Sequence, residues 1–281
     1  RLPGERCGGA IARTGTIAAE VRAFMEAVSV DQLISRIEQA AAAMDRPVLA
    51  TDADGTLWSG DVGLDVFEAL LAKGGVREEA RPALMAEAVA VGAPASGDAT
   101  AVASAIYEAF KHRALSEERA YEVMAWVFAG HTLEQARELA VVVQRQLQLE
   151  QRLHAEMLAI VSWALGRGID VWVVSASPQF VVQQGVARLG IPADRVIGAE
   201  PAMAQGLIAP RMAHRMPYGP GKLEAIARVL GPAQLVAAFG DSGFDVPMLR
   251  AAAVSVAVRP KATLCAAAGQ VPAMLELAPR A

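Results

Sequence analysis

The chain has 281 residues, of which 54% are apolar and 20% charged, and its net charge is −4. This length can bury the core of one large domain, or of a core domain with a smaller one beside it. No apolar run reaches the roughly 18 residues of a membrane span. Acidic and basic residues are interleaved without the basic stripe of a nucleic-acid-binding protein. We therefore expect a globular protein that binds neither membrane nor nucleic acid.

Cysteine and histidine usage gives no sign of a disulfide framework or a zinc site. Two cysteines near opposite ends of the chain, Cys7 and Cys265, are too few for either. We expect two free thiols in a reducing compartment. No signal-peptide hydrophobic segment is visible, so the cytoplasm is the expected location. The histidines lack metal-ligand spacing and are expected to be solvated or core residues: His112, His131, His154 and His214.

The first 46 residues are predicted to form an N-terminal helical extension. Residues 1–15 are rich in Gly and Arg and are predicted to form a loose arm. A helix is expected from Thr16, with one apolar face that includes Val21, Met25 and Val28. A second helix is expected after a cap at Ser29 or Asp31, and its apolar face comprises Leu33, Ile34, Ile37 and Ala41.

The stretch VLATDADGTLWSGD, residues 48–61, carries two acids at the end of an expected buried strand. Ligands of open α/β sheets bind outside the carboxyl ends of the strands. Asp52 and Asp54, two residues apart, would face the same way and either share a proton or hold a cation. A solvated surface loop is the common alternative. A calcium loop is excluded, because its sixth and twelfth positions would hold Leu57 and Gly63 instead of Gly and Glu.

Between residues 61 and 166 the sequence predicts helices and no strand. Helices are expected over 61–73, 76–91, 98–113, 116–128, 132–148 and 150–166. A crossover between parallel strands usually needs a single helix. Residues 61–166 are therefore predicted to be an inserted all-helical cap, with its last helix returning to the core.

The run IDVWVVSASP, residues 169–178, is expected to be a central strand covered on both faces. Ser175 and Ala176 lie near its end, and Pro178 is expected to start a helix. Free N–H groups at a helix N-terminus together with seryl oxygens form an anion site. An N-terminal cap is the structural alternative for the serine.

The last part of the chain predicts further strands and a second acid pair. Residues 191–212 are expected to form a small β excursion that includes 196–198 and 207–208. A helix is expected from about 219–222, where GPGK lacks the first Gly and the Ser/Thr of a nucleotide-binding loop. The run LVAAFGDSGFD predicts a strand that ends at Asp241 and Asp245. One more strand is expected at 254–258, followed by a helical tail from Arg259.

These strand ends, with Lys222 before the last, resemble the four motifs of the haloacid dehalogenase superfamily in their usual order. The match covers residues 48–61 and 169–258. It implies an α/β fold, with a Rossmann-like parallel-sheet core formed by residues 47–60 and 167–281. The helical cap between the first and second motifs resembles the phosphoserine phosphatase-like branch.

The resemblance implies a magnesium-dependent phosphatase of small phosphomonoesters that works through an aspartyl phosphate. Asp52 would be the nucleophile, and Asp54 would protonate the leaving oxygen and then activate water. Dehalogenases of the superfamily lack this second acid. Ser175, Ala176 and Lys222 would hold the phosphoryl group.

The same resemblance implies a Mg²⁺ site and an amine-bearing substrate. The implied metal ligands are Asp52, the backbone carbonyl of Asp54, Asp241 and Asp245, although Asp245 is better suited to orient Lys222 or a metal-bound water. Asp61 occupies the position of a substrate-binding Glu in phosphoserine phosphatases, so a phosphoserine-like metabolite is expected. Helix capping is the structural alternative for Asp61.

The substrate and the type of reaction stay open within this picture. Phe244 replaces an Asn of the phosphoserine phosphatase motif. A phosphotransferase on the same fold, or a silent phosphate-binding module, is the alternative to a phosphatase. The oligomeric state is not predicted.

Overall fold

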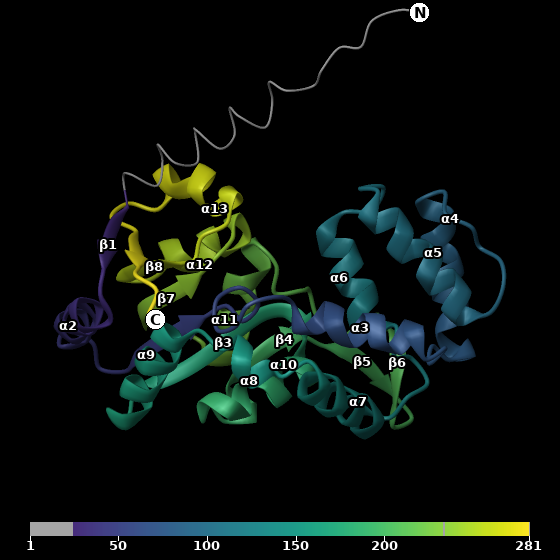
Figure 1. The fold of residues 1–281 in the computed structure, drawn as a ribbon, viewed down its shortest axis with the longest axis horizontal. Coiled ribbons are helices and arrows are strands. Elements are labelled where there is room, and N and C mark those ends of the chain that lie inside the picture. Colours follow the sequence, from purple (N-terminus) through teal and green to yellow (C-terminus); the bar gives the residue numbers. More distant parts are fainter. Residues whose placement is uncertain (1–24, 233, 281) are drawn as a thin grey trace, which may run out of the picture.

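A seven-stranded parallel sheet forms the centre of the computed structural model, which describes residues 25–232 and 234–280. The strand order is β1-β9-β8-β7-β2-β3-β4, and every neighbouring pair is parallel. Helices lie on both faces (Figure 1). The predicted α/β class with a Rossmann-like sheet is confirmed. The strands are β1 (Glu26–Val28), β2 (Pro47–Thr51), β3 (Asp170–Pro178), β4 (Val196–Ala199), β7 (Gln234–Gly240), β8 (Val254–Val258) and β9 (Leu275–Leu277).

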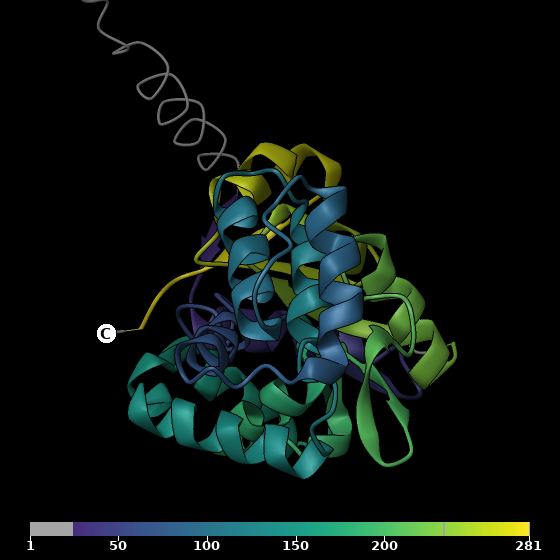
Figure 2. The ribbon, with the colours of Figure 1, turned by 90° about the vertical axis from the view of Figure 1, so that its right-hand side faces the viewer.

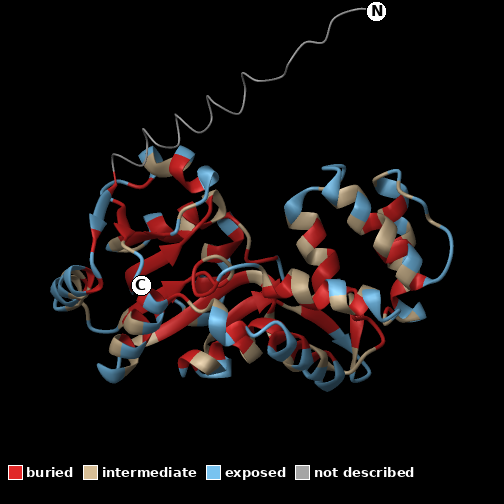
Figure 3. Cartoon of the chain, viewed as in Figure 1, coloured by how far each residue is buried: buried red, intermediate tan, exposed pale blue. Residues whose placement is uncertain are grey.

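Alternate residues of the central strands enter two different apolar layers. Leu49 packs with one layer, whereas Val48 and Ala50 pack with the other. This alternation follows from the two-residue period of a strand. Because both faces are covered, the central strands β2, β3, β7 and β8 are buried over most of their length (Figure 3). The first layer is covered by α2 (Val30–Ala41), α9 (Ala155–Gly166) and α10 (Gln179–Val186), and the second by α11 (Pro220–Leu230), α12 (Val246–Arg250) and α13 (Ala262–Ala267).

A group of helices stands beside the sheet, on the right of Figure 1 and facing the viewer in Figure 2. Each of α3, α5, α6 and α7 starts at a residue whose side-chain oxygen accepts a first-turn backbone N–H. These caps explain why the predicted helix starts are accurate. The helices of this group are α3 (Val62–Ala72), α4 (Arg81–Ala90), α5 (Ala99–Lys111) and α6 (Glu117–Trp126), whereas α7 (Leu133–Gln146) and α8 (Leu149–Arg152) lie below the sheet in Figure 1.

The prediction of one helix over residues 150–166 is wrong at its start, because the helix is interrupted at residues 153–154, between α8 and α9. The backbone N–H of His154 donates to the Leu57 carbonyl at 2.9 Å, and Leu153 forms a β-bridge with Trp58. The backbone of Leu153 and His154 therefore pairs with the 52–61 loop and cannot continue the helix. As predicted, α9 returns to the core, where it packs on β3 and α2.

The other cap helices divide between two sites of packing. Helix α7 packs on α3 and α10, whereas α6 packs on the hairpin of β5 (Pro201–Ala204) and β6 (Leu207–Met212). This hairpin confirms the predicted β excursion. Residues 196–198, expected in the same excursion, instead form the edge strand β4. The division of the chain at residues 46, 60 and 166 stays a prediction.

Both ends of the described chain contain a strand where the sequence predicted helix. Residues up to 24 of the helix expected from Thr16, and Cys7, lie outside the described residues. Glu26–Val28 is a strand that pairs with β9, and β9 itself follows α13 in the expected helical tail. Three-residue strands are too short to show a period of two. The second helix begins after Ser29, as predicted. Within the described residues, no helix combines the length and apolar character needed to cross a membrane.

Candidate active site

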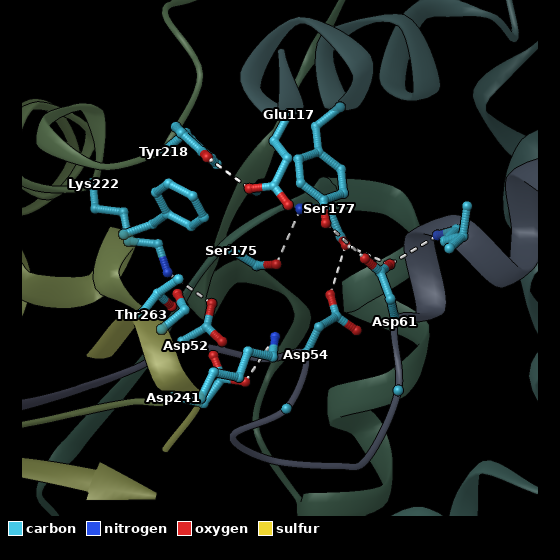
Figure 4. A pocket seen from close by; sticks show the side chains of 18 of the residues that line it. Asp52, Asp54, Asp61, Glu117, Ser175, Ser177, Tyr218, Lys222, Asp241 and Thr263 are labelled. Carbon is cyan, nitrogen blue, oxygen red and sulfur yellow. Dashed lines mark hydrogen bonds and ion pairs between the residues drawn. The ribbon is translucent and has the colours of Figure 1, made fainter. Parts of the chain in front are cut away.

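The carboxyl ends of three neighbouring strands bring the predicted site residues together. Strands β7, β2 and β3 are adjacent in the sheet, and Asp241, Asp52 and Ser175 lie at or near their ends. A cavity of about 660 Å³ opens at this edge (Figure 4). Its lining includes seven of the eight predicted residues: Asp52, Asp54, Asp61, Ser175, Ala176, Lys222 and Asp241.

Lys222 bridges two buried carboxylates at the base of the cavity. Its Nζ donates to Asp52 Oδ1 at 2.7 Å and to Asp245 Oδ1 at 2.5 Å. Burial alone would lower the pKa of Lys222, but Asp245 and Asp52 outweigh it and raise that pKa. The lysine is therefore a permanent positive charge. The preceding residue, Gly221, packs closely on Met216, where a Cβ would lie 2.0 Å from the carbonyl oxygen.

Asp245 lies behind the cavity lining and holds the loop that carries Asp241. Its Oδ2 accepts the backbone N–H groups of Asp241 and Ser242 at 3.1 and 3.0 Å, and the Ser242 hydroxyl at 3.0 Å. Its Oδ1 accepts Lys222. Because both oxygens already have partners, the geometry favours Asp245 as the residue that orients Lys222.

Asp54 has different neighbours from Asp52. Its Oδ1 accepts Trp58 Nε1 and the Val62 N–H, each at 2.8 Å, and its Oδ2 accepts the Ser177 hydroxyl at 2.6 Å. Burial, and then the charge of Asp61, raise the pKa of Asp54 to about 7 against these hydrogen bonds. The carboxyl group can therefore both donate and accept a proton near neutral pH.

Three buried carboxylates form the candidate metal centre of the described residues. Asp52, Asp241 and Asp245 each offer an oxygen, and these oxygens lie within 4.8 Å of one another. Hard carboxylate oxygens suit Mg²⁺, which keeps several waters. Burial raises the pKa of Asp52 to about 8, although Lys222 opposes this shift, and a bound cation would favour the ionised form of the cluster. These residues fit a magnesium ion, with Asp52 and Asp241 as the better carboxylate ligands.

Gly55 lets the first motif approach Asp241 closely. Its φ is +89°, and a Cβ there would lie 1.9 Å from Asp241 Oδ2. The same oxygen accepts Lys261 Nζ at 2.9 Å, and the Lys261 side chain is 61% exposed. Burial raises the pKa of Asp241, and Lys261 opposes that shift. Lys261 was not identified from the sequence, since a single lysine after a strand carries no motif.

Asp61 lies where both roles that the sequence left open, helix capping and substrate binding, are possible. It caps α3, because its Oδ1 accepts the Leu64 N–H at 2.8 Å, and it also lines the cavity. Its Oδ2 accepts the Tyr121 hydroxyl at 3.1 Å. Burial raises the pKa of Asp61, against the Leu64 N–H and Tyr121.

Other lining residues were missed by sequence reasoning. Ser177 is part of the S-A-S run, so its spacing could have indicated the contact with Asp54. Four further lining residues belong to no motif, because they come from three separate segments: Glu117, Tyr121, Tyr218 and Phe244.

Comparison with known proteins agrees with this geometry. A family model for haloacid dehalogenase-like hydrolases matches residues 49–250. The hydrolase-named protein ML2424 of Mycobacterium leprae (strain TN) is 26% identical over 176 residues, which are 57% of this chain and 55% of that protein. The chain thus spans about half the length of this curated relative.

Solved structures share the fold. A protein of unknown function from Bordetella pertussis Tohama I has a TM-score of 0.65 at 19% identity, over 84% of this chain and 99% of that one. A probable phosphoserine phosphatase from Vibrio cholerae has a TM-score of 0.51 at 14% identity, over 84% and 62%. With the family model covering most of the chain, the predicted membership is confirmed: this protein belongs to the haloacid dehalogenase-like hydrolases.

Proposed function

We propose that the protein is a magnesium-dependent phosphatase that hydrolyses small phosphomonoesters through an aspartyl phosphate on Asp52. The observation that carries this proposal is the difference between two acids of one cavity. Asp52 contacts the permanent cation Lys222, whereas Asp54 is held by neutral donors. Such separated environments assign different roles to paired carboxyl groups. The resemblance to a probable phosphoserine phosphatase supports the same class of reaction.

The base of the cavity has the groups that a phosphoryl dianion needs. The ammonium of Lys222 and the hydroxyl of Ser175 face the same space as Asp52, with Ala176 beside them. Lys222 acts as a point charge on the phosphoryl oxygens. Mg²⁺, held by Asp52, Asp241 and the Asp54 carbonyl, with Asp245 behind them, would neutralise the remaining charge.

The reaction then follows from the two acids. A carboxylate oxygen of Asp52 forms a bond to phosphorus while the bond from phosphorus to the leaving oxygen breaks, and Asp54 gives that oxygen a proton. Asp54, now ionised, takes a proton from the water that attacks the aspartyl phosphate. This step releases inorganic phosphate and restores both acids.

Release of aryl alcohol from a generic aryl phosphate, with Mg²⁺ or with excess chelator, tests this proposal. We expect turnover with Mg²⁺, none with chelator, and none for Asp52→Asn, whose amide cannot attack phosphorus. Asp31→Asn, an exposed acid of α2, is the matched control and should retain full activity. Turnover by Asp52→Asn without deamidation would remove the nucleophile assignment. Phosphate transfer to an added alcohol, in place of hydrolysis, would indicate a phosphotransferase, and binding without turnover a silent module.

A further inference from the structure

Five of the lining residues form an acid–aromatic wall of the cavity. Asp61 caps α3, Glu117 and Tyr121 lie on α6, Tyr218 precedes α11, and Phe244 follows β7. Figure 4 shows Glu117 and Asp61 across the view from Asp241 and Lys222. The leaving group of a phosphomonoester bound at Asp52 would face this wall.

The wall is held together by two hydroxyl-to-carboxylate bonds and by ring contacts. Tyr218 donates to Glu117 Oε2 at 3.1 Å, and Tyr121 donates to Asp61 Oδ2 at 3.1 Å. The ring centroids of Tyr218 and Phe244 are 4.2 Å apart, and those of Tyr121 and Tyr218 are 6.4 Å apart. Neutral hydroxyls orient the two acids but leave their charge uncompensated.

The charges of the cavity are divided between its two ends. Among the described lining residues, the basic side chains are Lys222 and Lys261. Lys222 pairs with Asp52 and Asp245, and Lys261 pairs with Asp241. The described part of the chain offers no ion-pair partner to Asp61 or Glu117. Both lysines of the cavity therefore pair with aspartates at the strand ends, whereas Asp61 and Glu117 add negative charge at the wall without an ion-pair partner among the described residues.

We propose that the substrate is a phosphomonoester whose leaving alcohol carries an ammonium group and no carboxylate. This inference rests on the proposed phosphatase function. An ammonium near the wall compensates Asp61 and Glu117, and aromatic faces attract cations. Methylated ammonium groups are also expected substrates, because they are weakly hydrated and lose little when aromatic rings replace water around them.

A leaving group with a carboxylate, as in phosphoserine, is disfavoured by the same wall. Its carboxylate would approach Asp61 and Glu117, and no arginine of the described residues lines the cavity to receive it. Phe244, which replaces an amide side chain of the phosphoserine phosphatase motif, packs on Tyr218 and extends the aromatic surface.

Four phosphate esters distinguish the effect of the leaving group's charge from the effect of its shape. We would compare kcat/KM for 2-(trimethylammonio)ethyl phosphate and its uncharged isostere 3,3-dimethylbutyl phosphate, then for 2-aminoethyl phosphate and phosphoserine. We expect the wild-type protein to prefer each cationic ester over the isostere and over phosphoserine by about tenfold or more. Equal efficiency on the charged and uncharged pair, or a preference for phosphoserine, would overturn the inference.

A matched pair of variants locates the effect. Glu117→Gln should reduce the preference for the cationic ester over its isostere about threefold or more. Glu118→Gln, which removes a charge next to the wall but outside the cavity lining, should leave the preference unchanged. Equal losses in both variants would assign the preference to the general field of α6 and would contradict the wall.

Binding to Asp52→Asn distinguishes failure of this inference from failure of the proposed function. Calorimetry with Mg²⁺ should show tighter binding of the trimethylammonium ester than of the isostere, whether or not the wild-type protein turns over any ester. If the protein hydrolyses aryl phosphate but binds the two esters equally, the phosphatase function holds and ammonium recognition by the wall is wrong. If it binds the cationic ester more tightly but hydrolyses no ester, ammonium recognition holds and the phosphatase function is wrong.

Discussion

Burial and the nearby charge of Asp61 raise the pKa of Asp54 to about 7, against the hydrogen bonds that both of its oxygens accept. We expect Asp54→Asn to slow hydrolysis of alkyl phosphates strongly, by about 10²-fold or more, because the leaving alkoxide then lacks a proton donor. A good aryl leaving group needs no proton, so its defect should be much smaller. Steady-state rates over a series of leaving-group pKa values measure this difference. A uniform defect across the series would contradict the general-acid role.

Asp61 combines a helix cap with a place in the cavity, and a charge-removing substitution separates the two. Asn caps as well as Asp, so Asp61→Asn should keep α3 stable. If the Asp61 carboxylate binds the substrate ammonium, kcat/KM of the variant should fall roughly tenfold for ammonium-bearing phosphates alone. This loss corresponds to about 1.4 kcal/mol of transition-state stabilisation. Thermal unfolding of the same variant is the control. No change on any substrate would leave capping as its role.

At the scale of elements, Arg152 at the end of α8 connects the 52–61 loop with α3. Its Nε donates to the Ser59 carbonyl at 2.7 Å, and its Nη1 to Asp65 on α3 at 2.6 Å. Both side chains of the ion pair are largely buried. Arg152→Ala should lower the free energy of unfolding by about 1.5–3 kcal/mol, the range for hydrogen bonds to charged groups.

Urea unfolding measures this loss, and a second arginine gives the comparison. Arg36 pairs with Glu26 on the surface, where both side chains are exposed. Arg36→Ala should cost at most about 1 kcal/mol, since exposed ion pairs contribute little. Equal costs for the two variants would show that the Arg152 contacts do not stabilise the loop.

Local signals decided how much of the fold could be predicted. Caps such as Ser29 and Asp98 mark helix starts within a few residues, and continuous apolar runs mark central strands. The break at His154 could not be predicted, because its partner Leu57 is distant in the chain. Likewise, the strand-end acids were identifiable because parallel strands bring their carboxyl ends together. The wall depends on which residues of α6 face the cavity, and distant packing decides that.

At the scale of the molecule, binding of Mg²⁺ should stabilise the fold. A ligand at 100 times its Kd adds about 2.7 kcal/mol to the free energy of unfolding. We expect a concentration-dependent rise of Tm with MgCl₂ and loss of that rise in Asp241→Asn, which removes a carboxylate from the cluster. NaCl at equal ionic strength is the control. The same rise in the variant would place the ion elsewhere.

The cap and the core also share one continuous apolar interior. Phe128, which follows α6, meets Phe180 of α10 edge to face, with ring centroids 5.1 Å apart. Trp58 of the nucleophile loop is fully buried against α10, where a Cβ on Gly185 would lie 2.9 Å from its ring. Trp58 therefore anchors the 52–61 loop to α10, which limits the movement of this loop.

The pairing of β1 with β9 bears on how the chain matures during synthesis. These strands lie at the two ends of the described chain and are neighbours at one edge of the sheet. While the protein emerges from the ribosome, β1 is made early but has no edge to join until β9 has left the exit tunnel. Strand pairings between such distant segments form late, since they close the largest loop. The nascent polypeptide therefore keeps β1 without its partner strand until residues 275–277 have been made, and the sheet edge forms after the rest of the described strands.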